Sequence, residues 1–370
     1  MGSLLDGRQE LEFDGIGRAI ERGDTLPGRW YTDPQIAALE EERIFGRSWQ
    51  YVGLAAQIPR PGDYLTHRVG RSSVLVVRGE LGEIGAFANV CRHRGAELLD
   101  GCGHARSLRC PYHGWAYGLD GSLRSVPRAR RNPGFDREGL SLHRLRCGTL
   151  GPLIFVNPDP EAAPLEETFA GWLERLEAGG IRFAPTLTLV AVHEHVVEAN
   201  WKLICENTYE CYHCPVNHPE LAAVRDVRPD FWYEFHERHS VHALPDETAT
   251  ADVGPGQLAL GSHLWPNVFP VIRDGGSIVV LQALPLDAER SIYRREFWFA
   301  QDAAPETVAS MIEFIDLTDA EDIALLAGVQ RGQRHPHYDR GRLLLPKTEP
   351  AIQFHQRMVY RAVAGLDRDA

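Results

Sequence analysis

The stretch CRHRGAELLDGCGHARSLRCPYHGW, residues 91–115, decides how the first half of the chain folds. It contains Cys91 and His93, followed by Cys110 and His113. Each pair puts a thiolate and an imidazole on one tight loop, and two such loops face each other when a small β domain carries them. The four residues suit a closed, tetrahedral zinc site. They equally suit a two-iron, two-sulfide cluster with both cysteines on one iron and both histidines on the other.

A second group of candidate ligands lies in CENTYECYHCPVNH, residues 205–218. An iron that activates O₂ requires two imidazoles and a carboxylate on one face, with the opposite positions open. His213 and His218 can supply the imidazoles. Cys211 and Cys214 form a Cys-x-x-Cys pattern that also allows zinc binding or thiol–disulfide chemistry. Because thiolates beside such an iron would be oxidised, we expect these cysteines to serve helix packing.

The surroundings of the first group resemble the Rieske motif, with glycine after the first pair and proline, glycine and tryptophan around the second. Respiratory-type Rieske proteins carry an additional cysteine in each loop, and here Ala96 and Tyr112 stand in those places. The resemblance is therefore to the oxygenase type. It implies that a [2Fe-2S] cluster is held by four residues: Cys91, His93, Cys110 and His113.

The second group resembles the catalytic segment of Rieske non-heme iron oxygenase α-subunits, in which Glu-Asn and an acidic residue precede His-x4-His. The resemblance assigns catalytic roles to Asn207 and Glu210 and makes His213 and His218 ligands of a mononuclear iron. The family places the third ligand on a helix about a hundred residues downstream, which implies Asp322. Three nearby acids compete for that role: Asp316, Asp319 and Glu321.

The acidic residue also has consequences for assembly. In the family, this residue connects a Rieske histidine of one subunit to an iron-ligating histidine of its neighbour. Glu210 would therefore link His113 of one chain to His213 of another, and head-to-tail contacts that close give a ring, expected to be a homotrimer. A glutamate at this position resembles the branch that acts on choline, betaines and carnitine.

The function implied is the terminal component of a multicomponent oxygenase. It would use O₂ and electrons from a reductase or ferredoxin, with NAD(P)H oxidised only by that partner. The expected reaction is monooxygenation or N-demethylation of a quaternary ammonium compound. The alternative is hydroxylation or O-demethylation of an aromatic compound. The aromatic side chains of residues 230–235, Trp265 and Phe269 suit both interpretations, because they could surround a quaternary cation or contact an aromatic ring. A Rieske electron carrier or a zinc-binding non-enzyme is a remote alternative.

The fold class implied is α+β. We expect an N-terminal helical segment at 1–44 packing on the catalytic domain, an all-β Rieske domain at 45–156, and a catalytic domain at 157–370 with an antiparallel sheet around a long helix (a helix-grip type). Local patterns predict the elements in more detail. These are a helix at 33–45, strands at 72–79, 84–90 and 187–199, a helix capped by Asn200 and ending near His213 because of Pro215, paired strands at 276–286 and 291–300, and a helix over 304–332 interrupted around Thr318–Asp319.

Composition limits the partners. A net charge of −12 argues against nucleic acid and anionic membranes. No apolar run is long enough to cross a bilayer, the N-terminus lacks a signal sequence, and we expect a cytoplasmic protein. Seven cysteines in 370 residues do not suggest a disulfide scaffold. Residues 91–131 carry eight arginines and three acidic residues. Either solubility or the docking of an acidic electron donor explains this excess of positive charge.

Overall fold

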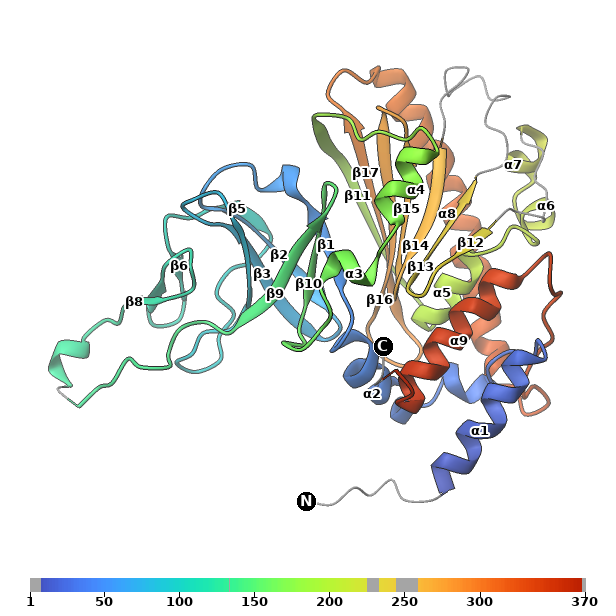
Figure 1. Cartoon of the computed structure of the whole chain (residues 1–370), viewed down its shortest axis with the longest axis horizontal. Coiled ribbons are helices and arrows are strands. Elements are labelled where there is room, and N and C mark those ends of the chain that lie inside the picture. The colour runs from blue at the N-terminus through green and yellow to red at the C-terminus, as the bar shows by residue number, and fades with distance from the viewer. Residues whose placement is uncertain (1–7, 133, 225–232, 244–258, 368–370) are drawn as a thin grey trace. The chain divides into compact units, whose positions relative to one another are not determined.

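The computed structural model describes residues 8–132, 134–224, 233–243 and 259–367. The chain forms two compact units, and Figure 1 shows their elements. One unit spans Phe45–Thr168, and the other combines Met1–Ile44 with Phe169–Ala370. The N-terminal segment thus belongs to the same unit as the C-terminal half.

The boundary between the two units lies after Thr168 rather than after Val156. Residues 157–168, which the sequence interpretation assigned to the catalytic domain, group with the preceding strands. The physical reason is that helix α3 (Leu165–Thr168) packs on strand β9 (Arg144–Leu150), with Leu165 buried.

The unit at Phe45–Thr168 is built of antiparallel strands. A seven-stranded sheet has the order β1-β10-β9-β4-β3-β2-β5, and a three-stranded sheet has the order β6-β7-β8. The predicted strands at 72–79 and 84–90 are confirmed as β3 and β4, which pair with each other. The bounds are β1 Gln50–Leu54, β2 Asp63–Val69, β3 Ser72–Arg78, β4 Ile84–Ala88, β5 Cys102–His104, β6 Leu108–Arg109, β7 Ala116–Tyr117, β8 Leu123–Ser125 and β10 Leu153–Asn157.

The core of this unit lies against the predicted cluster loops. Leu75, Phe87 and Tyr117 are buried together with Cys91 and Cys110 in one apolar cluster. The two cysteines are therefore anchored from the protein interior, while the tips of their loops extend beyond it.

The other unit contains a second antiparallel sheet of seven strands, in the order β11-β17-β16-β15-β14-β13-β12. The predicted strand at 187–199 is confirmed as β11, and the predicted pair at 276–286 and 291–300 is confirmed as β16 and β17. The α+β fold is thereby confirmed. The bounds are β11 Leu187–Val197, β12 Tyr233–Phe235, β13 His239–Ala243, β14 Ala259–Leu264, β15 Val268–Arg273, β16 Ser277–Pro285 and β17 Ser291–Ala300.

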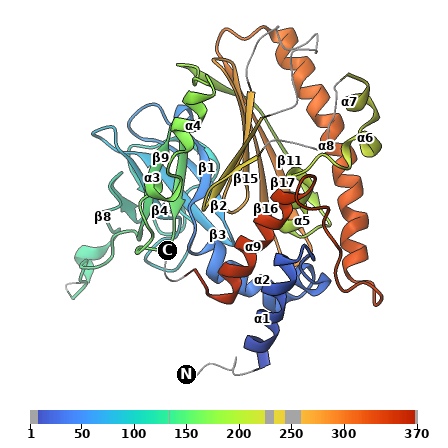
Figure 2. The same ribbon diagram turned by 45° about the vertical axis from the view of Figure 1, so that its right-hand side comes forward.

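The long helix α8 (Pro305–Gln333) runs beside this sheet, as Figure 2 shows. Its first half presents Val308, Ile312 and Ile315 to buried side chains of β16 and β17. The predicted interruption around Thr318–Asp319 is wrong, because both polar side chains find partners while the helix continues. The hydroxyl of Thr318 donates to the carbonyl of Phe314, four residues earlier, and Asp319 accepts hydrogen bonds from β17.

The N-terminal segment packs on the last helix of its unit. Helices α1 (Arg8–Glu21) and α2 (Pro34–Glu40) both contact α9 (Pro350–Ala364). The predicted helix at 33–45 is α2 followed by a π-helical turn at Glu41–Phe45, with Asp33 as its N-cap. The buried Glu40 accepts a hydrogen bond from Nζ of Lys202 at 2.5 Å, which ties α2 to the helix of the candidate site.

That helix, α5, ends earlier than predicted. Asn200 caps it as expected, since its side chain accepts from the N–H of Lys202. However, α5 is Trp201–Thr208 rather than a helix to His213. Glu210 causes the early end, because its carboxylate accepts the backbone N–H groups of the following turn.

Pro215 has a different effect from the one predicted. It lies in the first turn of a new helix, α6 (Cys214–Asn217), where a proline needs no intrahelical hydrogen bond. Helix α7 (Pro219–Val224) follows directly. The remaining helix of this unit, α4 (Trp172–Ala178), precedes β11. The two candidate histidine ligands therefore lie on either side of the short helix α6, between α5 and α7.

Candidate active site

The two predicted cluster loops share one backbone structure. In the first loop the N–H of Gly95 donates to the carbonyl of Cys91, and in the second the N–H of Gly114 donates to the carbonyl of Cys110, both at 3.1 Å. Both glycines have positive φ, 75° and 72°, which other residues rarely adopt. The glycine after each pair is thus required by the turn that presents the side chains.

The two predicted cluster histidines meet between these loops, and the two cysteines belong to the apolar cluster beneath them. Cys91 and Cys110 are buried, whereas His93 and His113 are exposed. The Nδ1 atoms of the two histidines lie 3.2 Å apart. Two nitrogens on one tetrahedral metal ion are separated by about 3.3 Å, so these residues fit a cluster with its histidine iron at the surface.

Two aromatic residues that the sequence did not single out as functional support the first loop. Trp115 stacks on the ring of His93, with centroids 4.8 Å apart. The hydroxyl of Tyr117 accepts from the N–H of Arg92 at 3.0 Å and lies 3.3 Å from Sγ of Cys91, to which it can donate. Partial desolvation by neighbouring side chains, together with electrostatic repulsion from His93 and Arg94, lowers the pKa of the exposed His113, which favours the neutral imidazole that binds metal.

The second site begins at the turn after α5. Glu210 accepts hydrogen bonds from the N–H of His213 at 3.2 Å and from its Nδ1 at 2.5 Å. This pairing leaves Nε2 of His213 free to point toward Asp322, whose Oδ1 lies 3.4 Å away. The acidic residue and the first histidine of the motif are thus held together within one chain.

His218, at the end of α6, is buried. Its Nδ1 donates to Glu321 at 2.7 Å, and its Nε2 lies 3.1 Å from Oδ1 of Asp322. The amides of Asn207 and Asn217 also donate to this oxygen, at 3.2 and 3.3 Å. The structure therefore brings together five of the predicted site residues, Asn207, Glu210, His213, His218 and Asp322, with two others, Asn217 and Glu321, around Oδ1 of Asp322.

The other acids considered for the third ligand are committed elsewhere. Asp316 pairs with His193 at 2.7 Å, Asp319 accepts from Tyr293 at 2.6 Å, and Glu321 accepts from the outer nitrogen of His218. Only Asp322 among the four has contacts to both candidate histidines in the described residues. Glu321 and Asn217 were missed as supporting residues. Their position next to predicted ligands was the only available signal.

The electrostatics of this group fit a divalent metal ion. Burial raises the pKa of Asp322, but hydrogen bonds from His213 and His218 outweigh it and lower the pKa to about 2. Burial lowers the pKa of His213, but Asp322 and Glu210 raise it to about 9. In the metal-free protein, protons thus hold the imidazoles against the carboxylate, and a metal ion would replace them. Two imidazoles and one carboxylate suit iron(II).

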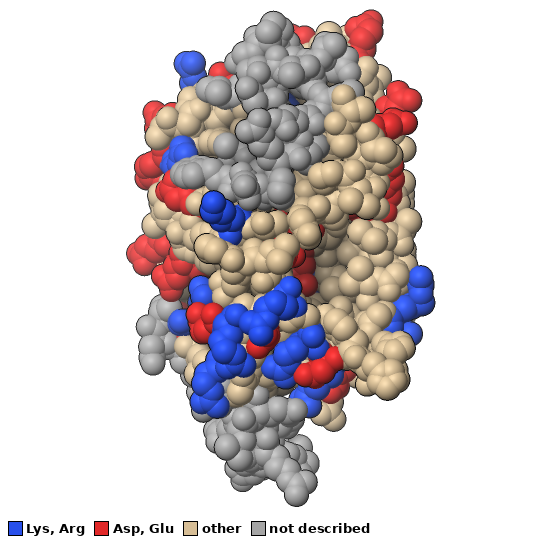
Figure 3. All heavy atoms as spheres, turned by 90° about the vertical axis from the view of Figure 1, so that its right-hand side faces the viewer, with Lys and Arg blue, Asp and Glu red and all other residues tan. Residues whose placement is uncertain are grey.

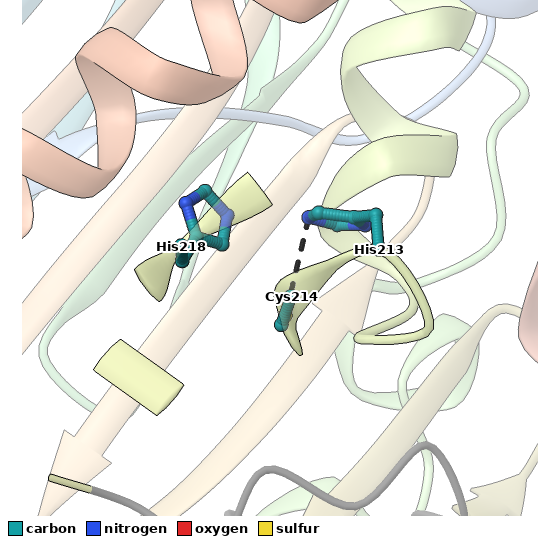
Figure 4. Close-up of side chains that lie close together, drawn as sticks. All are labelled: His213, Cys214 and His218. Carbon is teal, nitrogen blue, oxygen red and sulfur yellow. Dashed lines mark hydrogen bonds between the residues drawn. The ribbon is translucent and has the colours of Figure 1, made fainter. Parts of the chain in front are cut away.

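The prediction for the two cysteines of the turn is wrong. Cys211 and Cys214 form a disulfide rather than packing a helix, because α5 ends before them and the turn brings them together. Figure 4 shows Cys214 beside His213 and His218. Its Sγ lies 3.9 Å from Nε2 of His213, and the ligand atoms of the three residues all lie within 4.8 Å of one another.

The remaining cysteine and histidine of the first stretch, and the aromatic residues considered as ring contacts, are not among these site residues. His104 pairs with Asp63 at 3.0 Å, and Cys102 is exposed on β5. Trp265 and Phe269 are buried in the core beside His355 and Tyr209. Of the segment 230–235, residues 230–232 lie outside the described residues.

Comparison with known proteins identifies the family. The family described as "Rieske [2Fe-2S] domain" matches residues 48–143, and "Ring hydroxylating alpha subunit (catalytic domain)" matches residues 184–365. A carnitine monooxygenase oxygenase subunit of Acinetobacter baumannii is 31% identical over 341 residues, 90% of this chain and 91% of that protein. The chain belongs to the family of Rieske-type ring-hydroxylating oxygenase α-subunits. It is therefore an O₂-dependent enzyme with a Rieske [2Fe-2S] cluster and a mononuclear iron.

Further relatives agree with this family. A choline monooxygenase of Beta vulgaris is 31% identical over 339 residues, 90% of this chain and 75% of that protein. Among solved structures, the quaternary ammonium Rieske monooxygenase CntA in complex with L-carnitine matches with a TM-score of 0.84 and 28% identity, over 94% of this chain and 98% of that one. Naphthalene 1,2-dioxygenase, at 21% identity and a TM-score of 0.77, shares the fold.

Membership of the family excludes two of the alternatives, the simple electron carrier and the zinc-binding non-enzyme. Rieske oxygenases act on small molecules and receive electrons from a partner protein. None of the described helices is both long and apolar enough to span a bilayer.

Proposed function

We propose that this chain is the terminal subunit of a monooxygenase system that hydroxylates a quaternary ammonium compound of the carnitine, choline or betaine type. If the hydroxylated carbon is bound to nitrogen, the product can lose an aldehyde, which is N-demethylation. The names of the relatives support this substrate class, as do the substrates L-carnitine and γ-butyrobetaine in the solved complexes of CntA. The glutamate at position 210 gives independent support, since it resembles this branch of the family.

One observation carries the proposal: two imidazole nitrogens and one carboxylate oxygen converge at the end of a turn. Nε2 of His213 and Nε2 of His218 lie 3.4 and 3.1 Å from Oδ1 of Asp322. We propose these three atoms as the iron ligands. Bound iron(II) would supply the activation of O₂ at its open positions.

The chain's own residues orient these ligands. Glu210 fixes the tautomer and rotation of His213 through Nδ1, and Glu321 does the same for His218. We propose that Asn207 is a positioning residue, because its amide donates to Asp322 Oδ1 at 3.2 Å. The burial of His218 and Asp322 keeps bulk water away from one side of the group.

We propose that Cys91, His93, Cys110 and His113 hold the cluster, and that subunits assemble head to tail as a homotrimer. Exposed His113 could then contact Glu210 of a neighbour. Mixing two variants of impaired activity tests this arrangement. Trimers reassembled from Glu210→Ala and His113→Ala subunits should regain activity at junctions where both partner residues are intact. Failure of all mixtures to regain activity would contradict an intersubunit route.

We propose that the electron donor docks near the cluster, where most of the eight arginines of residues 91–131 are exposed. Lys and Arg also gather on part of the face shown in Figure 3, although the net charge is −12. Because basic side chains gather in more than one place, their presence alone does not identify the surface on which the donor docks. Raising the ionic strength should slow electron transfer if charge steers the encounter.

The substrate class can be tested with two molecules of one shape. Choline and 3,3-dimethyl-1-butanol differ in the positive charge, because carbon replaces nitrogen. With a reductase present, we expect O₂ uptake coupled to product for choline, carnitine or a betaine and not for the neutral analogue. Coupled turnover of an aromatic methyl ether, with none of any quaternary ammonium compound, would favour the aromatic alternative.

A further inference from the structure

The disulfide in the turn between α5 and α6 encloses a proposed iron ligand. Cys211 and Cys214 lie on either side of His213, two residues before it and one after it. Cys214 is buried, whereas Cys211 is partly exposed. One sulfur therefore lies next to the candidate metal site, and the other is within reach of solvent.

The pairing is selective. The other five cysteines of the described chain are free, including the exposed Cys102. The disulfide also closes a loop with a sequence separation of only 3. A loop this short removes little entropy from the unfolded chain, on the order of 2 kcal/mol, compared with about 4.7 kcal/mol for a loop of 100 residues. Stabilisation of the fold is therefore a weak reason for this disulfide.

The position of Cys214 suggests a stronger reason. Its Sγ lies 3.9 Å from Nε2 of His213. With metal–nitrogen and metal–sulfur bonds of about 2.1 and 2.3 Å, two donors on one ion are separated by about 3.1–3.6 Å. A shift of about half an ångström would therefore make the sulfur a ligand. As a thiolate it would occupy a position that O₂ or substrate needs, whereas a disulfide sulfur is a poor ligand.

We propose that Cys211 and Cys214 are a reversible redox pair that controls access to the iron. As a disulfide, the pair keeps Cys214 from binding and leaves the open face of the iron free. As a dithiol, it releases Cys214 as a fourth protein donor beside His213, His218 and Asp322. This inference deepens the proposed function and rests on it.

The redox step needs a dithiol as reductant and hydrogen peroxide as oxidant. A thiolate of the reductant attacks Sγ of the partly exposed Cys211, the S–S bond breaks, and Cys214 leaves as a thiolate. The second thiol of the reductant then closes its own disulfide and frees Cys211 as a thiol. In the reverse direction, two thiols and one H₂O₂ give the disulfide and two water molecules.

Cobalt(II) in the mononuclear site gives a direct test. X-ray absorption at the cobalt edge sees only cobalt, so the cluster iron and sulfide do not interfere. A phosphine serves as reductant because it contains no sulfur: phosphine, disulfide and water give phosphine oxide and two thiols. We expect no sulfur neighbour of cobalt before reduction, and one sulfur per cobalt at about 2.3 Å after it.

Two variants should behave in opposite ways. Cys211→Ser leaves Cys214 permanently free, so cobalt should have a sulfur neighbour with or without phosphine. Cys214→Ser should show no sulfur in either condition. Cys147→Ser, on β9, is the matched control and should respond to phosphine as the unchanged protein does.

The outcomes separate this inference from the function on which it rests. Cobalt bound with nitrogen and oxygen neighbours only, before and after reduction, overturns the redox control and leaves the proposed metal site intact. Failure of cobalt to bind, or binding unaffected by His218→Ala, overturns both. Alkylation followed by mass measurement should show Cys211 and Cys214 blocked in protein prepared in air, and two labelled thiols there would also overturn the inference.

Discussion

Glu210 accepts a hydrogen bond at 2.5 Å from Nδ1 of His213, three residues further along the chain. The same carboxylate accepts the backbone N–H of His213, so one side chain ends α5 and orients an imidazole that we propose as an iron ligand. A ring held at Nδ1 presents Nε2 in one direction, toward Asp322. A single residue, Glu210, therefore determines both where the helix ends and how the imidazole of His213 is oriented.

Replacing Glu210 should reduce turnover without removing the cluster. We expect Glu210→Ala to lower product formation by about 10- to 100-fold, because the imidazole of His213 loses the partner that orients it. The visible spectrum of the cluster should not change. Glu220→Ala, an exposed glutamate on α7, is the control. Activity of Glu210→Ala within twofold of the unchanged protein would show that this hydrogen bond is dispensable.

Replacing Asp322 should remove the mononuclear iron alone. With a two-iron cluster and one separate iron, the content should fall from about three irons per chain to about two in Asp322→Ala. The matched control is Asp316→Ala on the same helix, because that carboxylate pairs with His193 instead. Iron content and cluster absorbance measure the two centres separately. Loss of cluster absorbance in Asp322→Ala would mean that the two sites are not independent.

The sequence predicted the elements whose signals are local. Asn200 caps α5 because its side chain reaches the N–H of Lys202, two residues away. The predicted break in α8 failed because its signal depends on distant partners. Asp319 reads as a helix-breaking polar residue in isolation, but Tyr293 of β17 donates to its carboxylate at 2.6 Å. Tertiary contacts of this kind leave no local pattern.

The candidate site shows the same division. His213 and His218 were identifiable from spacing, and Asp322 required a family resemblance because more than a hundred residues separate it from them. The disulfide of Cys211 and Cys214 was not predicted, since it depends on where α5 ends. That end is set by the carboxylate of Glu210, a hydrogen-bond choice that helix propensity does not reveal.

Replacing Tyr117 should lower the reduction potential of the cluster. The hydroxyl lies 3.3 Å from Sγ of Cys91, and a hydrogen bond to a cluster sulfur stabilises the more negative, reduced state. If that preference is about 1 kcal/mol, Tyr117→Phe should shift the potential down by about 40 mV. Redox titration followed by visible absorbance measures it. Tyr112→Phe, on the exposed tip of the second loop, is the control, and an equal shift in both variants would contradict the assignment to Cys91.

Glu206 should make the unit containing α5 less stable as the pH rises. Burial raises the pKa of this carboxyl to about 7, although hydrogen bonds from Tyr31 and Gln356 lower it. The folded carboxyl has a higher pKa than the unfolded one, which is about 4.5. Its stabilising contribution is therefore complete below about pH 4.5 and is lost as the pH rises from about 4.5 to 7, where the unfolded chain releases the proton first. The loss is on the order of 3 kcal/mol between about pH 4.5 and 7, with no further change above.

Comparison with Glu206→Gln isolates this contribution, because other titrating groups are common to both proteins. The variant keeps an oxygen acceptor for Tyr31 but cannot ionise. Its melting temperature relative to the unchanged protein should therefore rise from pH 5 to pH 7 and then level off. Glu234→Gln should show almost no trend over this range, since a hydrogen bond from Arg175 lowers the pKa of Glu234 and its carboxyl therefore titrates below about pH 5 in both the folded and the unfolded protein. A difference for Glu206→Gln that is flat across this range would show that Glu206 is already ionised in the folded protein at pH 5.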